Sequence, residues 1–245
     1  MASDHIVVDV EIKVPVISVT GGWDATDKLG VSCAVVYDYQ RDKFSVFGDT
    51  DQDLSRLQDR ILVADRVTTY NGWHFDYPVI WGYSRRKWSA EPALDIVRTL
   101  ADTCDDLLRR IWIGRAAPRG DPDNGGYFLP KIGENHWKYE GLGLDAIATG
   151  TLGHGKSGHG VDAPVWYQRG EWGRLCDYCL GDVAIERDLG NFMERYGYVV
   201  HRGSKKYVAA WQDDARLGRL AERGRRSIRG PERESSESPG YQSRK

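Results

Sequence analysis

The residues of this chain best suited to chemistry are carboxylates. Asp9 and Glu11 are two positions apart in the β-prone stretch His5–Ile12, so their side chains leave the same face of the expected strand. Two neighbouring carboxylates on a strand repel each other unless a cation lies between them. The pair therefore indicates either a cation site or an edge strand with one polar face, and the spacing alone favours neither.

Two further acids lie in patterns of their own. Asp76 ends the segment Asn71-Gly72-Trp73-His74-Phe75-Asp76, at the expected start of a helix, where the helix dipole favours a negative charge. Tyr178 and Asp182 are four positions apart on an expected helix and so share one face. Taken singly, each acid has a simpler explanation as a first-turn acid or a solvated side chain.

The order of the three patterns changes this interpretation. A strand with Asp-x-Glu, then Asn-x-x-x-Phe-Asp, then a helical Tyr-x-x-x-Asp resembles the DnaQ-like 3′–5′ exonucleases, members of the DEDD family with a ribonuclease H-like fold. The resemblance covers about residues 5–195, and the tyrosine four positions before the last acid matches the DEDDy branch. Two departures stand out: Ile12-Lys13 replaces the family's usual Thr and small residues, and the segment 114–141 matches no family feature.

The resemblance implies a two-metal site. Two divalent cations, Mg²⁺ or Mn²⁺, would be held by Asp9, Glu11, Asp76 and Asp182. Tyr178 would complete the catalytic set by orienting the attacking water, because a phenol with a free pKa near ~10 is a poor general base. The residues expected to bind substrate are Asn71, Trp73, His74, Phe75 and Lys156.

The expected activity is metal-dependent hydrolysis of single-stranded DNA from its 3′ end, which releases nucleoside 5′-monophosphates. A 3′–5′ exoribonuclease is the alternative within the same class, because no residue identifies a contact to a 2′-hydroxyl. A non-catalytic nucleic-acid-binding module that kept the fold is an alternative from another class. The expected partner is single-stranded nucleic acid, DNA in preference to RNA, with a replication or repair assembly acting in trans as a further candidate.

Two other patterns have simpler explanations. The segment Gly150–Ser157 satisfies the P-loop pattern of ATPases and kinases, but that pattern needs a strand before it and a helix after it. Here a helical stretch precedes it, and glycines and Pro164 follow. Cys176 and Cys179 lie within an expected helix without a second pair at zinc-finger spacing, so packing explains them better.

The elements that must position these residues follow from hydrophobic patterning. Short apolar runs between polar turns predict strands at 5–12, 29–39, 43–47 and 66–70, the first three as an antiparallel meander. Apolar residues at helical spacing predict helices at 53–63, 75–86, within 93–113, at 142–149 and at 172–196. This alternation predicts an α/β domain, and the resemblance adds a ribonuclease H-like fold with a mixed central sheet flanked by helices.

Composition bounds the organisation of the 245 residues. No stretch approaches the ~20 apolar residues of a membrane span, no secretory signal is evident and cysteines are few, so we expect a cytoplasmic protein without membrane contact. Residues 201–245 hold 12 basic and 6 acidic side chains, which leaves 22 and 30 in the first 200. We expect one exonuclease domain over 1–212, with an irregular insertion at 114–141, and a flexible basic tail over 213–245.

Overall fold

The computed structural model of the chain describes residues 3–88, 93–116, 142–202 and 206–208. Within these residues a mixed five-stranded sheet forms the centre of an α/β structure. Its strands are β1 (His5–Ile12), β2 (Val31–Asp38), β3 (Lys43–Phe47), β4 (Arg66–Thr69) and β5 (Cys104–Asp106). In space they follow the order β3-β2-β1-β4-β5. The predicted α/β class and mixed sheet are confirmed, whereas β5 is not predicted.

Strand β1 is the central strand and separates two kinds of pairing. It pairs antiparallel with β2, which pairs antiparallel with β3, so the predicted meander is confirmed. On its other edge β1 pairs in parallel with β4, and the last pair in that register joins Val7 to Thr68. Beyond Val7, β4 no longer pairs with this edge of β1. The stretch of β1 that carries Asp9 and Glu11 therefore borders a gap in the sheet.

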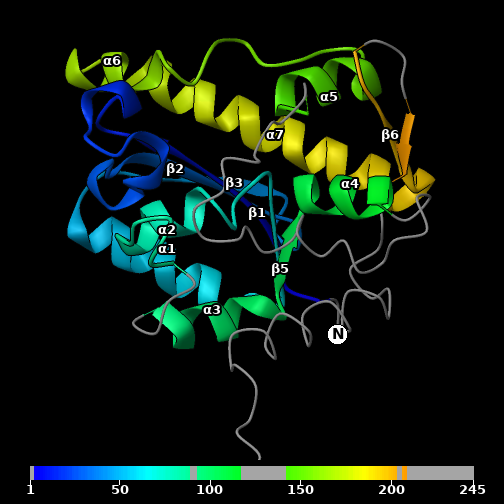
Figure 1. Ribbon diagram of the computed structural model, residues 1–245, viewed down its shortest axis with the longest axis horizontal. Helices are drawn as coiled ribbons and strands as arrows, with labels where there is room; N and C mark the ends of the chain where they lie inside the picture. The colour runs from blue at the N-terminus through cyan, green and yellow to red at the C-terminus, as the bar shows by residue number, and fades with distance from the viewer. Residues whose placement is uncertain (1–2, 89–92, 117–141, 203–205, 209–245) are drawn as a thin grey trace, which may run out of the picture.

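Helices cover both faces of the sheet (Figure 1). On one face lie α1 (Asp51–Val63), α2 (Asp76–Trp81) and α3 (Leu94–Ala101). Against the other face lie α6 (Ala163–Gln168) and α7 (Trp172–Tyr196). Near the end of α7 lie α4 (Leu107–Ala116), α5 (Leu144–Leu152) and the short antiparallel pair β6 (Tyr198–Val200) and β7 (Lys206–Val208). Short 3₁₀ turns occupy Val16–Ser18, Gly22–Asp24 and Thr26–Lys28.

The alternation of side chains along β1 decides which helix its acids meet. Val8 and Val10 pack in the core shared with α1 and α2. Val7 points the other way, into the apolar cluster shared with α6 and α7. Asp9 and Glu11 have the same parity as Val7, so they face α7.

Glycines set the ends of the two helices that carry the remaining acids. Helix α7 ends at Gly197, whose φ of 70° and N–H bond to the Met193 carbonyl close the last turn. Its bounds confirm the predicted helix 172–196. Helix α2 ends at Gly82, which has a φ of 67°, so the predicted helix 75–86 is too long.

Two other boundaries differ from the prediction. The helices predicted within 93–113 are confirmed as α3 and α4, but between them lies the unpredicted strand β5, which is only three residues long and includes two aspartates. Helix α4 continues to Ala116, so the irregular segment does not begin at 114. The rest of that segment, 117–141, and the expected tail 213–245 lie outside the described residues. None of the helices in the described part of the chain is both long and apolar enough to span a bilayer.

Candidate metal centre

Strand β1 and helix α7 bring three carboxylates together. One oxygen each from Asp9, Glu11 and Asp182 lies within 4.8 Å of the other two. Glu11 and Asp182 are buried, and Asp9 is partly exposed. These side chains come from the central strand and from the helix that crosses its face, so both supports are rigid elements (Figure 1). Hard oxygen ligands at this spacing suit a divalent cation such as Mg²⁺ or Mn²⁺.

Asp76 lies beside this cluster and outside its 4.8 Å limit. It is the first residue of α2, is buried, and its Oδ1 accepts a hydrogen bond of 3.2 Å from the backbone N–H of Val10. Val10 lies on the part of β1 where β4 no longer pairs, so the carboxylate replaces a missing strand partner. This hydrogen bond to Val10 holds the Asp76 carboxylate against β1, between the backbone positions of Asp9 and Glu11.

Asp106, at the end of β5, holds the loop that leads to Asp76. Its Oδ1 accepts from the Asn71 N–H at 3.0 Å, and its Oδ2 accepts from the Trp73 N–H at 3.2 Å. Asn71 has a φ of 69°, and a side chain at Gly72 would collide with Thr69. The loop is therefore tightly specified, and Asp106 is a supporting residue that the sequence analysis did not identify.

The acids of the cluster hold their protons more strongly than free carboxylates do. Burial, and then the neighbouring Asp182, raise the pKa of Asp9 to about 7, against the opposing effect of Lys156. Burial and the charge of Asp9 raise the pKa of Glu11 and of Asp76 well above the ordinary values. Burial and mutual repulsion therefore both disfavour the ionised acids, and a bound cation would offset both effects.

Lys156 provides part of that positive charge from the loop after α5. Its Nζ lies 2.5 Å from Oδ2 of Asp182 and 5.0 Å from the centre of the Tyr178 ring. Its backbone N–H donates to Oδ1 of Asp145 at 3.0 Å, which fixes the loop against α5. Burial lowers the pKa of Lys156, but Asp182 and Asp9 raise it by more, so the ammonium stays charged. The sequence suggested a phosphate contact for Lys156, and the structure pairs it with an acid of the cluster.

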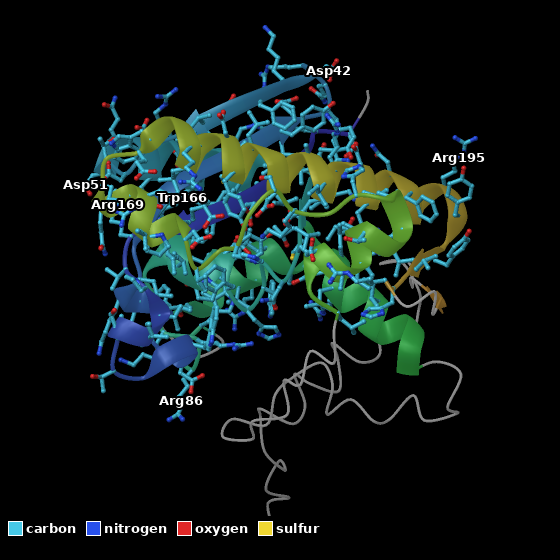
Figure 2. All side chains as sticks on the ribbon, turned by 90° about the horizontal axis from the view of Figure 1, so that it is seen from above. Asp42, Asp51, Arg86, Trp166, Arg169 and Arg195 are labelled. Carbon is cyan, nitrogen blue, oxygen red and sulfur yellow. The ribbon has the colours of Figure 1, made fainter. Side chains whose placement is uncertain are left out.

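Tyr178 lies one turn before Asp182 on α7 and points into the same region. It packs edge-to-face against Trp166 of α6, with ring centroids 5.4 Å apart, and Figure 2 shows Trp166 beside α7. Within the described part of the chain, its hydroxyl has no hydrogen-bond partner. Burial, and also the charge of Asp182, raise the pKa of Tyr178, so the hydroxyl remains protonated and able to donate.

The other residues expected to bind substrate differ in how far they are buried and in what they contact. Trp73 is only 8% exposed and packs in the core, which leaves it little surface for stacking on a base. His74 is partly buried, and burial followed by the nearby arginines lowers its pKa to about 3, so it is neutral. Phe75 packs edge-to-face on Trp23, with ring centroids 5.8 Å apart, and Trp23 is 60% exposed. Asn71 stands at the turn held by Asp106.

The P-loop pattern does not have the structure that phosphate binding requires. Gly150 lies inside α5, and a side chain there would collide with the backbone of Val200. Thr151 donates to the Val200 carbonyl at 3.0 Å and accepts from the Val200 N–H at 2.9 Å. The first glycine thus allows a close approach of α5 to β6.

The cysteines pack beside the acids. Cys179 is buried and its thiol donates to the backbone carbonyl of Asp9 at 3.5 Å. Cys33, opposite Glu11 in the sheet, lies 3.9 Å from Cys176 between the sulfur atoms. All three are free thiols, and they fill the space between β2 and α7, in agreement with the packing explanation.

One further acid near the cluster was not predicted from the sequence. Glu186 lies one turn after Asp182 on α7 and is 1% exposed. The available signal was its spacing of four positions from Asp182, which places both side chains on one helix face.

Comparisons with known proteins do not assign the chain to a family. No protein-family model matches it, and no curated protein matches it. Among solved structures it is similar to the family B DNA polymerase from the hyperthermophilic archaeon Pyrobaculum calidifontis, with 15% sequence identity and a TM-score of 0.44. The match covers 79% of this chain and 25% of the polymerase chain, so the chain spans about a quarter of the polymerase's length.

Proposed function

We propose that this protein is a 3′–5′ exonuclease of the ribonuclease H-like type that uses two divalent cations and acts on single-stranded DNA. The observation that carries the proposal is the convergence of the carboxylates of Asp9, Glu11 and Asp182 within 4.8 Å. Tyr178, one turn before Asp182, adds a protonated hydroxyl with no hydrogen-bond partner in the described residues. These residues occur in the order and spacing of the motifs that the sequence shares with DEDDy nucleases.

The acids fit the cations that such a reaction uses. Asp9, Glu11 and Asp182 would hold the first cation, and Asp9 and Asp76 would contribute to the second. When bound, the cations stabilise the negative charge that develops during phosphodiester hydrolysis and lower the pKa of water. Their charge would also relieve the repulsion that raises the pKa of the four acids.

The chain's own residues supply orientation and charge. The hydroxyl of Tyr178 orients the attacking water, which a protonated phenol does by donating or accepting a hydrogen bond. Lys156 would leave Asp182 if that carboxylate ligated a cation, and its ammonium would then be free to neutralise a substrate phosphate. Single-stranded DNA is the proposed substrate because the acids are mostly buried between β1 and α7, a position that favours a separated 3′ end over a duplex.

The proposal is tested with a single-stranded DNA oligonucleotide labelled at its 5′ end. In Mn²⁺ the labelled strand should shorten stepwise from its 3′ end, and nucleoside 5′-monophosphates should be released. EDTA should stop the reaction. Asp182→Ala should abolish cleavage, whereas Asp177→Asn, an exposed acid of the same helix, should not. An RNA oligonucleotide of the same sequence distinguishes the exoribonuclease alternative. Metal-independent binding of the DNA without any shortening would contradict the proposal and favour a non-catalytic binding module.

A further inference from the structure

The side chain of Glu186 is a buried acid with an unused ligand atom. It is 1% exposed, and its Oε2 has no hydrogen-bond partner among the residues that the structure describes. Its position one turn beyond Asp182 on α7 places it about 6 Å further along the helix axis, on the same face. A buried carboxylate oxygen without a partner is costly, and a cation bound beside it would remove that cost.

The path of α7 places Glu186 over the gap in the sheet. At Asp182 the helix faces Asp9 on β1. At Gly190, two turns later, a side-chain position would lie 3.8 Å from Thr68 on β4. Glu186 lies midway between these two contacts, above the place where β4 stops pairing with β1 and Asp76 enters.

The charges that act on Glu186 agree with this position. After burial, the strongest effects that raise its pKa come from Asp9 and then from Asp76, ahead of Asp182. Asp76 and Glu186 both stand outside the compact cluster of three acids, and a second cation held by Asp9 and Asp76 alone would have few carboxylate ligands.

We propose that Glu186 is a ligand of the second divalent cation, which it holds together with Asp9 and Asp76; this inference rests on the proposed two-cation exonuclease. Each cation then has three carboxylates, with Asp9 shared between the two sites.

The test is a calorimetric titration of the full chain with Mn²⁺ at neutral pH. The wild-type protein should bind two ions. Glu186→Gln should keep one site and weaken the other at least tenfold. Asp177→Asn, which removes an exposed carboxylate from the same helix, should match the wild type. Asp182→Asn should instead weaken the first site.

Thermal unfolding supplies a second measurement that does not depend on activity. In EDTA, Glu186→Gln and the apolar variant Glu186→Met should unfold at or above the wild-type temperature, because each removes an uncompensated buried acid. Both should lose part of the rise in unfolding temperature that Mn²⁺ produces. The Met variant serves where the Gln variant fails to fold.

The possible outcomes separate this inference from the proposed function. A wild-type protein that binds no Mn²⁺ contradicts the exonuclease proposal itself. A wild-type protein that binds one ion, or a Glu186→Gln variant that binds two ions with unchanged affinity, overturns the role of Glu186. Reduced stability of both variants in EDTA, with both Mn²⁺ sites intact, would make Glu186 a structural residue.

Discussion

At the scale of single residues, the chemistry of the centre depends on which groups keep their protons. Asp9 has a pKa of about 7, so in the absence of a cation it is partly protonated at neutral pH. Tyr178 remains protonated because burial and Asp182 raise its pKa. The two groups therefore suit different roles: the acid becomes a ligand when a cation displaces its proton, and the phenol remains a hydrogen-bonding group.

Tyr178→Phe should slow cleavage on the order of 100-fold, because it removes one positioned hydroxyl and hardly any volume. Metal affinity and the unfolding temperature should stay as in the wild type, since the ring keeps its contact with Trp166. Single-turnover cleavage and Mn²⁺ calorimetry measure these quantities. A loss of substrate affinity at an unchanged rate would make Tyr178 a binding residue.

Lys156→Met should destabilise the metal-free protein and strengthen its binding of Mn²⁺. The ammonium forms a mostly buried ion pair with Asp182, and breaking such a pair costs about 3 kcal/mol. Without the ammonium, the acids repel one another more strongly and no internal cation competes for Asp182. Urea unfolding in EDTA and calorimetry give the two values. Weaker Mn²⁺ binding in the variant would show that Lys156 supports the metal and does not compete with it.

At the scale of elements, the long and regular parts of the fold could be predicted from the sequence, and the short ones could not. The apolar face of α7 repeats over 25 residues, so its bounds follow from spacing and from Gly197. Strand β5 has only three residues, Cys104–Asp106, and two of them are aspartates, so no hydrophobic pattern predicts it. Its aspartates form tertiary hydrogen bonds and ion pairs that no local pattern records.

The candidate site shows the same division. Asp9 and Glu11 share a strand face, and Tyr178 and Asp182 share a helix face, so local periodicity was enough to pair them. The ion pair of Lys156 with Asp182 depends on how the loop after α5 returns to α7, which periodicity does not specify. Glu186 was missed because a polar residue on a long helix is usually solvated.

Gly72→Ala tests whether the loop between β4 and α2 positions Asp76. An added Cβ would collide with the Thr69 side chain, and overpacking of this kind costs about 1–3 kcal/mol. Asp76 follows four residues later, so cleavage and the binding of a second Mn²⁺ should fall while the first Mn²⁺ site persists. Calorimetry and urea unfolding are the measurements.

The matched control is Gly173→Ala, in the first turn of α7. Nothing lies within 4 Å of a Cβ at Gly173, and alanine is a better helix former than glycine. This variant should be more stable by up to about 1 kcal/mol, with unchanged cleavage. If the two glycine variants behaved alike, the packing of the loop would not explain the position of Asp76.

At the scale of the whole molecule, metal-free stability should fall as the pH rises from about 7 to about 8.5. In this window the carboxyls of the unfolded chain are ionised, but Asp9, with its pKa of about 7, still binds a proton in part of the folded molecules. Burial raises the pKa of Glu11, Asp76 and Glu186 as well, so these acids act in the same direction. The folded protein therefore binds more protons than the unfolded chain. Each extra bound proton makes the free energy of unfolding fall by about 1.4 kcal/mol per pH unit. Urea unfolding in EDTA at four pH values measures the slope.

The choice of window and the addition of metal make this prediction specific. Burial, assisted by nearby arginines, lowers the pKa of His5 to about 4 and of His74 to about 3, so both histidines oppose the trend most strongly below about pH 6.5, and their effect fades as the unfolded chain loses its histidine protons above that pH. Saturating Mg²⁺ should flatten or reverse the slope, because it binds the ionised acids. A stability that rises with pH in EDTA would mean that the acids are already compensated within the chain.

The centre joins the first strand of the described fold to its last long helix, and the contact between Cys179 and Asp9 spans 170 positions of the chain. On a growing polypeptide, β1 leaves the ribosome long before α7 exists, and contacts of such sequence separation form late and slowly during folding. Until α7 docks, the face of β1 that carries Asp9 and Glu11 lacks its cover and its third carboxylate. An unfinished or unfolded chain therefore has no assembled centre. During refolding, the ability to bind metal should mark the docking of α7, well after the sheet itself has formed.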